Sequence, residues 1–209
     1  AVGPPSKRDS QRPGKTMSTA STPSFTAPRA SAARRELAII DPGVAEPERL
    51  LASLRPGIEV LRLDRHSHGL LQLATHLAGE HNIAALHLFG HGEPGGIDFG
   101  SGRLDITVIQ KSPRCLAAIA ARLAPEAAIQ LYACRSGHGA AGAALTTALA
   151  AASGASVHAA TGPIGPVSQG GTWTLDVGTA MQSIPSAVRR PDAYPHLLAN
   201  PTISALDNT

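Results

Sequence analysis

A histidine and a cysteine each follow a short apolar run, and no other pair in the sequence is as well suited to covalent chemistry. His91 comes after the run at residues 86–89 and lies between two glycines, whereas Cys134 comes after the run at residues 128–133. In an alternating α/β chain such runs are buried parallel strands, and active sites gather at the carboxyl ends of parallel strands. An imidazole beside a thiol can take the thiol proton and return it to a leaving group. The pair therefore predicts nucleophilic acyl transfer.

Each residue also has an interpretation that involves no chemistry. A histidine between glycines can simply occupy a turn, and free cysteine is often buried as a small hydrophobic residue. The loop after Cys134 leads into a predicted helix, however, and the amino end of a helix lowers the pKa of a nearby thiol. His138 lies four residues from Cys134 and competes for the role of base, but we expect it to enter this helix and point away from the strand ends. His91 is the favoured base.

The rest of the sequence alternates between apolar strands and amphipathic helices. Predicted strands cover residues 37–41, 58–63, 83–89, 127–133 and 156–160, with a small hairpin at 95–104 and a closing edge strand at 171–177. Predicted helices cover residues 46–54, 69–79, 113–123 and 140–152. This alternation is typical of a three-layer α/β/α sandwich with a mainly parallel sheet and right-handed crossovers.

The composition divides the chain into three parts. Residues 1–36 are rich in Ser, Thr, Pro and Arg and predict a disordered basic tail, residues 37–180 form the α/β domain, and residues 181–209 are a linker and the start of a following repeat. The tail holds seven of the 18 Lys and Arg residues and two of the 15 acidic residues, which leaves 11 basic and 13 acidic residues elsewhere. A folded part without excess positive charge predicts no nucleic-acid partner.

Several further residues could act as ligands or as structural groups. Cys115 and Cys134 are too few for a disulfide framework, and Cys115 is predicted to pack within a helix. His66 and His68 form an H-x-H pair without cysteine or carboxylate neighbours at metal spacing, so we predict neither a metal site nor a cofactor. Asp41 either lines the cleft or only terminates the first strand. No apolar run is long enough to span a membrane, and no Sec-type signal is visible.

The two motifs resemble those of the caspase and gingipain peptidases, in which one apolar strand ends in His-Gly and another in Ala-Cys or Gly-Cys. More closely, residues 36–179 resemble an uncharacterised domain near the amino terminus of large bacterial surface adhesins with RTX or cadherin repeats. The resembling pieces are Ala38–Asp41, Leu86–Gly92, Leu131–Cys134 and Trp173–Leu175. The resemblance implies a caspase-like fold.

The resemblance also implies a role for individual residues. His91 matches the general base, Cys134 matches the nucleophile, and the backbone N–H groups of Gly92 and Cys134 match the oxyanion-binding positions. The implied activity is that of a cysteine endopeptidase whose polypeptide substrate is its own chain or a neighbouring surface protein, in a secreted or cell-surface bacterial protein.

Residues 200–207 resemble the first strand of a cadherin-like repeat, so such repeats are expected to follow. The loop at residues 135–138 departs from its relatives, in which a small or acidic residue is usual, and this bears on substrate preference. A calcium requirement is left open.

Two other functions stay open at this stage. A peptidase-like module without activity would act as a folding or interaction cap for the adhesin, and a small-molecule hydrolase would use the same thiol. The presence of both dyad residues favours the peptidase, because a decayed copy is expected to lose at least one of them. The arginine pairs Arg34–Arg35 and Arg189–Arg190 lie in the flanking segments that we expect to be flexible, and they favour a basic residue before the scissile bond. The simpler interpretation is that these pairs only solvate linkers.

Overall fold

The computed structural model describes residues 1–3, 34–180 and 185–199. The chain divides into two compact units, residues 1–32 and 33–209, and the fold described below is that of the second unit. Nearly all of the predicted disordered tail and the predicted repeat strand at residues 200–207 lie outside the described residues. Within the described part of the chain, no helix is both long and apolar enough to cross a membrane.

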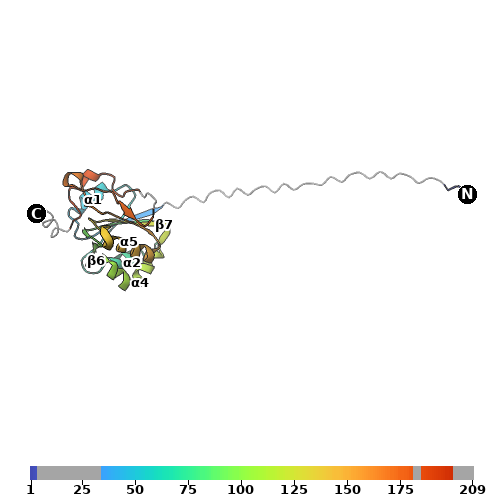
Figure 1. Cartoon of the computed structure of the whole chain (residues 1–209), viewed down its shortest axis with the longest axis horizontal. Helices are drawn as coiled ribbons and strands as arrows, with labels where there is room; N and C mark the ends of the chain where they lie inside the picture. The colour runs from blue at the N-terminus through green and yellow to red at the C-terminus, as the bar shows by residue number, and fades with distance from the viewer. Residues whose placement is uncertain (4–33, 181–184, 200–209) are drawn as a thin grey trace. The chain divides into compact units, whose positions relative to one another are not determined.

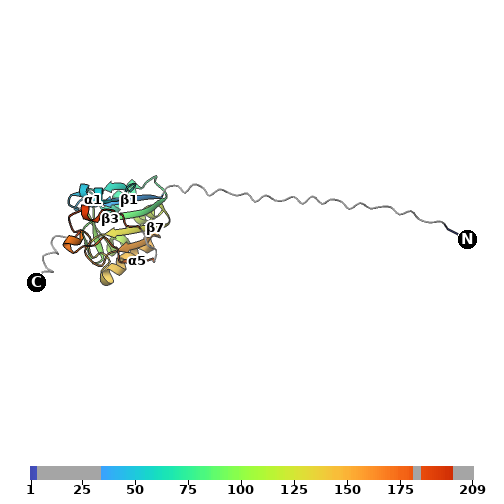
Figure 2. The same ribbon diagram turned by 90° about the horizontal axis from the view of Figure 1, so that it is seen from above.

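A six-stranded sheet forms the centre of the domain (Figures 1 and 2). Its strands, in chain order, are β1 (Arg35–Ile40), β2 (Glu59–Arg62), β3 (Ile83–Phe89), β7 (Leu123–Tyr132), β8 (Ser156–Ala159) and β9 (Val177–Gly178). The spatial order is β2-β1-β3-β7-β8-β9, and every neighbouring pair is parallel except β8 and β9. Phe89 pairs with Tyr132, so the central strands β3 and β7 end side by side. The residues that follow these two strands therefore meet at one edge of the sheet.

Helices and loops cover the two faces of the sheet, which confirms the predicted three-layer α/β architecture. Figure 1 shows α1 (Pro47–Ser53) on the side of the sheet opposite α2 (Gly69–His76), α4 (Pro113–Ala120) and α5 (Gly139–Ser153). The short helix α3 (Ile106–Lys111) packs against α4 and α5. The α1 side is completed by loops and by the 3-10 turns η1 (Val167–Gln169) and η2 (Pro191–Ala193).

A small antiparallel sheet begins directly after His91 and corresponds to the predicted hairpin. Its three strands are β4 (Gly92–Glu93), β5 (Gly96–Phe99) and β6 (Gly102–Asp105). Ile97 and Phe99 are fully buried in the helix-covered core, so the hairpin is fixed to the main domain. It extends the His91 end of β3 without entering the main sheet.

The alternation of side chains along the strands produces two separate cores. In β3, Leu86 and Leu88 enter the first core beneath α2 to α5, whereas Phe89 enters the second core on the α1 side. Phe89 stacks on Tyr132 in this second core, with ring centroids 4.6 Å apart and planes at 5°. A large apolar side chain that is fully buried stabilises the fold by roughly 1.5–3 kcal/mol. The second core also contains residues from the carboxyl-terminal segment, which is therefore part of the domain.

The ordered domain extends beyond the predicted boundary at residue 180. Ala187, Tyr194 and Leu198 are all 0 % exposed, and the Tyr194 hydroxyl donates to Ala45 O at 3.0 Å. The segment at residues 185–199 is thus a structural part of the α/β domain. Its high content of proline and polar residues gave it the appearance of a linker, because its apolar residues follow no strand or helix period.

Two predicted elements differ from the structure. The predicted edge strand at residues 171–177 is reduced to the two-residue strand β9, because Trp173 turns into the second core and its Nε1–H donates to Pro191 O at 3.1 Å. The sequence does not predict α3, because six residues are too few for the apolar positions to show a helical period. The carboxylate of Asp105 accepts from Val108 N and caps this helix.

The polar interior of the sheet leads to a prediction about acid stability. Glu36 Oε2 in β1 accepts from His87 Nε2 at 2.9 Å and from Arg55, and the His87 hydrogen bond is the first cause that lowers the Glu36 pKa. A lowered pKa gives stability that is present above the unfolded value of 4.5 and is lost as pH falls through the folded value. We expect Glu36→Gln to reduce the free energy of unfolding by about 1–2 kcal/mol at neutral pH, and the difference from wild type to shrink as the pH falls below 4.5. Urea unfolding at several pH values measures this difference, and a constant difference at all pH values would contradict the assignment.

Candidate functional site

His91 and Cys134 lie at the same edge of the sheet, each two residues beyond the paired strand ends Phe89 and Tyr132. Gly92 lets the two chain segments touch, because a Cβ there would lie 2.5 Å from Cys134 O and 2.7 Å from the Ala133 Cβ. The apolar runs that predicted the two strands also predicted that their ends would meet. The structure therefore brings the two predicted chemical groups to one place.

The His91 ring is held by one hydrogen bond that determines which nitrogen can act as a base. Its Nε2 lies 2.9 Å from Gly43 O, and a carbonyl can only accept, so Nε2 carries the hydrogen. In the neutral ring Nδ1 is then an acceptor, and this atom is buried without a hydrogen-bond partner in the structure. A buried unpaired polar atom is costly and calls for an explanation, and Nδ1 shares this property with Ser136 Oγ and His158 Nε2. In this tautomer Nδ1 is the ring nitrogen of His91 that can accept a proton.

Asp41 positions the loop that holds His91. The carboxylate is buried and accepts from Gly43 N at 2.7 Å and from Gly100 N at 2.8 Å. These bonds fix the turn that presents Gly43 O to the imidazole and also attach the hairpin. Of the two interpretations considered for Asp41, the structural one fits its contacts. The neighbouring Asp98 has a raised pKa because of burial and the nearby Asp41 charge.

The Cys134 thiol is buried and faces the backbone of Ile164. Its Sγ accepts from Ile164 N at 3.1 Å and lies 3.6 Å from Ile164 O. Burial raises the pKa of the thiol, so the expectation that the following helix lowers this pKa is wrong for the conformation described. The reason is that α5 begins only at Gly139, while the thiol is covered by neighbouring residues. Among the hydrogen bonds of the described residues, none joins Cys134 to His91.

The two backbone donors that the resemblance placed at the oxyanion positions converge on one acceptor. Gly92 N donates to Leu198 O at 3.3 Å, and Cys134 N donates to the same oxygen at 3.2 Å. Leu198 N donates to Ile164 O at 2.8 Å, and Ala199 forms a parallel bridge with Gly92. The carboxyl-terminal segment thus contacts the ends of β3 and β7 through these hydrogen bonds and one isolated bridge. Sequence reasoning gave Leu198 no part in the site, because a single leucine in a proline-rich segment carries no signal.

The remaining candidate residues take no part in this arrangement. His138 is exposed at the amino end of α5, and Cys115 in α4 is half-buried against the first core. Both ring nitrogens of His68 are used within the fold, since Nδ1 accepts from Leu70 N and Nε2 lies 3.0 Å from Arg103 O. Within the described ranges, no group of three or more His, Cys, Asp or Glu residues is arranged to hold a metal ion.

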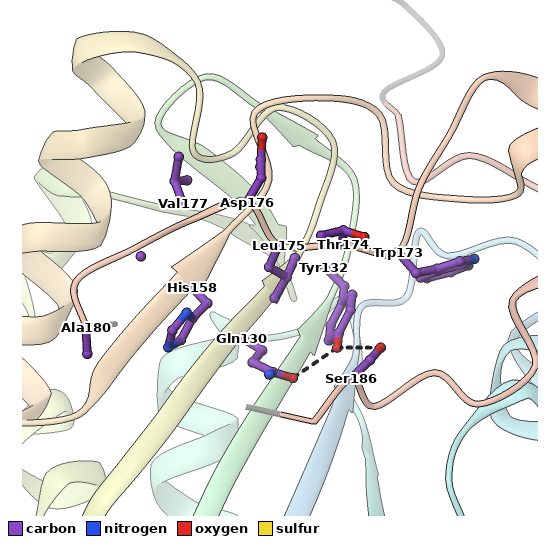
Figure 3. A pocket seen from close by; sticks show the side chains of 11 residues that line it. Gln130, Tyr132, His158, Trp173, Thr174, Leu175, Asp176, Val177, Ala180 and Ser186 are labelled. Atoms are coloured by element: carbon purple, nitrogen blue, oxygen red, sulfur yellow. Dashed lines mark hydrogen bonds between the residues drawn. The ribbon is translucent and has the colours of Figure 1, made fainter. Parts of the chain in front are cut away.

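A polar cavity of about 380 Å³ lies beside the second core and is lined in part by Gln130, Tyr132, His158 and Ser186 (Figure 3). The Tyr132 hydroxyl lies 3.0 Å from Gln130 Oε1 and 3.2 Å from Ser186 Oγ, so these groups largely satisfy one another. Gln130 also bonds to His87, its register partner in β3. His87 and Gln130 are polar residues within the otherwise apolar runs of β3 and β7, and this exception in the sequence could have indicated the network. Neither His91 nor Cys134 lines the cavity, whereas His158 does, and its Nε2 is buried without a hydrogen-bond partner among the described residues.

Comparison with known proteins assigns the chain to a family. No curated protein and no solved structure matches the sequence at a significant level. The family profile described as Domain of unknown function (DUF4347) matches residues 37–198. This range begins in β1, contains both His91 and Cys134, and ends at the leucine that accepts the two backbone hydrogen bonds. Because the match covers well over half of the sequence, the chain belongs to the DUF4347 family.

Proposed function

We propose that the domain is a cysteine endopeptidase with His91 as the general base and Cys134 as the nucleophile. The observation that carries the proposal is the convergence of Gly92 N and Cys134 N on a single peptide carbonyl at the edge where His91 and Cys134 meet. Two backbone donors on one carbonyl oxygen are what stabilises the charge that develops there in acyl transfer. The unpaired Nδ1 of His91 supplies the acceptor for the thiol proton.

The proposed reaction proceeds through a thioester. Nδ1 of His91 takes the thiol proton, which is needed because burial raises the pKa of Cys134. The sulfur then adds to the carbonyl carbon, while Gly92 N and Cys134 N bind the oxyanion. The peptide C–N bond breaks, and the imidazolium returns its proton to the departing amine. Water hydrolyses the thioester with His91 again as base, which restores the thiol and leaves a carboxylate.

In the conformation described, the thiol is not free to attack the carbonyl carbon. Cys134 Sγ is hydrogen-bonded to Ile164 N, and rotation about the Cα–Cβ bond has to release it before it can react. The same observation favours the second candidate function, that of a peptidase-like module without activity. The experiment below decides between the two.

The resemblance to adhesin domains extends the proposal to the protein as a whole. We propose that the substrate is the chain itself or a neighbouring surface protein, and that the protein is secreted or displayed on a bacterial cell, with cadherin-like repeats after the domain. The isolated parallel bridge between Gly92 and Ala199 supports a polypeptide substrate, because main-chain atoms of another segment pair with this edge of the sheet.

The test is whether the protein cleaves a peptide bond in a reaction that depends on Cys134. The purified protein is incubated under reducing conditions with and without calcium, alone and with an added unfolded protein such as carboxymethylated casein. We expect cleavage by the wild type and by Cys115→Ala, because Cys115 packs in α4 outside the site, and none by Cys134→Ala. Mass spectrometry identifies the new termini. If wild type and Cys134→Ala leave both proteins equally intact, the peptidase is excluded and the inert module is favoured.

A further inference from the structure

We infer, on the basis of the proposed peptidase, that the Leu198–Ala199 bond is the bond the domain cleaves in its own chain and that the domain selects leucine before the scissile bond. This inference identifies both a self-processing site and a substrate class. It rests on three backbone hydrogen bonds of Leu198, on the burial of its side chain and on the contacts of the two arginine pairs.

The backbone of Leu198 is bound as a substrate would be. Its carbonyl oxygen accepts from Gly92 N at 3.3 Å and from Cys134 N at 3.2 Å, and its N–H donates to Ile164 O at 2.8 Å. The residue that follows, Ala199, is aligned with Gly92 by a parallel bridge. All main-chain polar atoms of Leu198 are therefore paired with the site. The carbonyl that these donors polarise belongs to the Leu198–Ala199 bond.

The side chain of Leu198 is 0 % exposed and belongs to the second core. The apolar residues of this core include Val44, Tyr132, Cys134, Ile164, Trp173 and Tyr194. An apolar pocket favours an aliphatic side chain, whereas a charged one would lose its hydration without a partner. The pocket that holds the residue before the scissile bond is thus suited to leucine.

The arginine pairs that suggested a basic preference are held elsewhere in the fold. Arg35 lies within β1 and is paired with Glu59 and Glu80. The backbone N–H groups of Arg189 and Arg190 both donate to Ser53 O, at 2.8 and 3.0 Å. Neither pair is bound by the Gly92 and Cys134 donors, which hold the Leu198 carbonyl, so our inference takes leucine in place of the basic residue that the sequence suggested.

The reaction follows the thioester route given above, within a single chain. The Leu198 acyl group is transferred to Cys134 Sγ, and the proton from His91 goes to the Ala199 nitrogen, which becomes a new amino terminus. Water then releases the acyl group as the Leu198 carboxylate. Because nucleophile and bond belong to one chain, the reaction is first order and its rate does not depend on protein concentration. The family match ends at residue 198, on the residue that becomes the new carboxyl terminus.

The experiment is intact-mass analysis of the full 209-residue chain over time at two protein concentrations under reducing conditions. We expect the wild type to lose residues 199–209, with the new amino terminus at Ala199 and the same rate constant at both concentrations. Cys134→Ala is expected to keep the full mass. Leu198→Ala leaves the pocket partly empty and is expected to slow the loss on the order of 100-fold, while Leu197→Ala, which changes the neighbouring half-buried residue, is expected to cleave like the wild type.

The outcomes separate this inference from the proposed function. In one outcome the Leu198–Ala199 bond stays intact, while wild type or Leu198→Ala cleaves casein or another bond in a Cys134-dependent way. The domain is then a peptidase, and Leu198 only covers its site. Cleavage after Arg35 or Arg190 would likewise overturn the preference for leucine. If no bond is cleaved by any variant, the peptidase itself fails. Far-UV circular dichroism of each variant shows whether a lost reaction reflects a lost fold.

Discussion

Replacement of His91 by alanine should reduce cleavage of the Leu198–Ala199 bond by about 1,000-fold and leave the fold nearly unchanged. The imidazole is the group that takes the thiol proton, and burial raises the pKa of Cys134, so little thiolate forms without a base. The side chain is only half-buried and makes a single hydrogen bond, to Gly43 O, so its removal costs little core packing. Intact-mass time courses measure the rate, and thermal unfolding measures the stability.

The matched control for this variant is His138→Ala. His138 is the other histidine near Cys134 in the sequence, but it is exposed at the amino end of α5 and makes no capping hydrogen bond there. We expect this variant to cleave at the wild-type rate. Equal loss of cleavage in both variants would mean that His91 is not the specific base, and unaltered cleavage in His91→Ala would exclude it as the base altogether.

Gly92→Ala should have the second large effect, through the backbone. A Cβ at this position would lie 2.5 Å from Cys134 O, so the two strand ends have to separate. Gly92 N and Cys134 N would then no longer converge on one oxygen, and the loss of one such donor costs about 100-fold or more in rate. The same clash is expected to lower the free energy of unfolding by roughly 1–3 kcal/mol.

Gly162→Ala is the control for this glycine. A Cβ at Gly162 meets no atom within 4 Å, and the Gly162 carbonyl still accepts from Arg135 N at 2.9 Å. The variant should retain both stability and cleavage. The Gly92→Ala prediction is refuted if the variant folds and cleaves like Gly162→Ala, because the donors would then tolerate the separation of the strands.

The fold and the positions of His91 and Cys134 could be predicted from the sequence because both depend on side-chain type. Apolar runs predicted β3 and β7, and parallel strands that are neighbours deliver the residues after them to one edge. The same pattern gave the correct placement of His91 and Cys134. It also predicted that His138 would enter the next helix, but α5 begins at Gly139, and His138 is the exposed residue just before it.

The rest of the site could not be predicted because backbone atoms from irregular loops build it. Gly43 O holds the imidazole, Ile164 binds the thiol, and Leu198 supplies the bound carbonyl. Any residue type offers such backbone groups, so composition and spacing carry no trace of them. The Cys134 pKa was misjudged for the same reason, because the segments that bury the thiol lie 30 or more residues away in the sequence.

The segment that contains Leu198 also belongs to the second core, and this determines how readily the product of the proposed reaction can leave the site. A substrate that diffuses away leaves its site free, but Leu198 is buried in the second core, to which Tyr194 also belongs, and stays attached to the domain after the bond is broken. Its new carboxylate would remain against Gly92 N and Cys134 N, where two N–H groups bind an anion well. A processed molecule would then be its own product complex, and another substrate such as casein could enter only after the Leu198 segment has left the two donors. Release of this segment would therefore control when the proposed peptidase can act on other proteins.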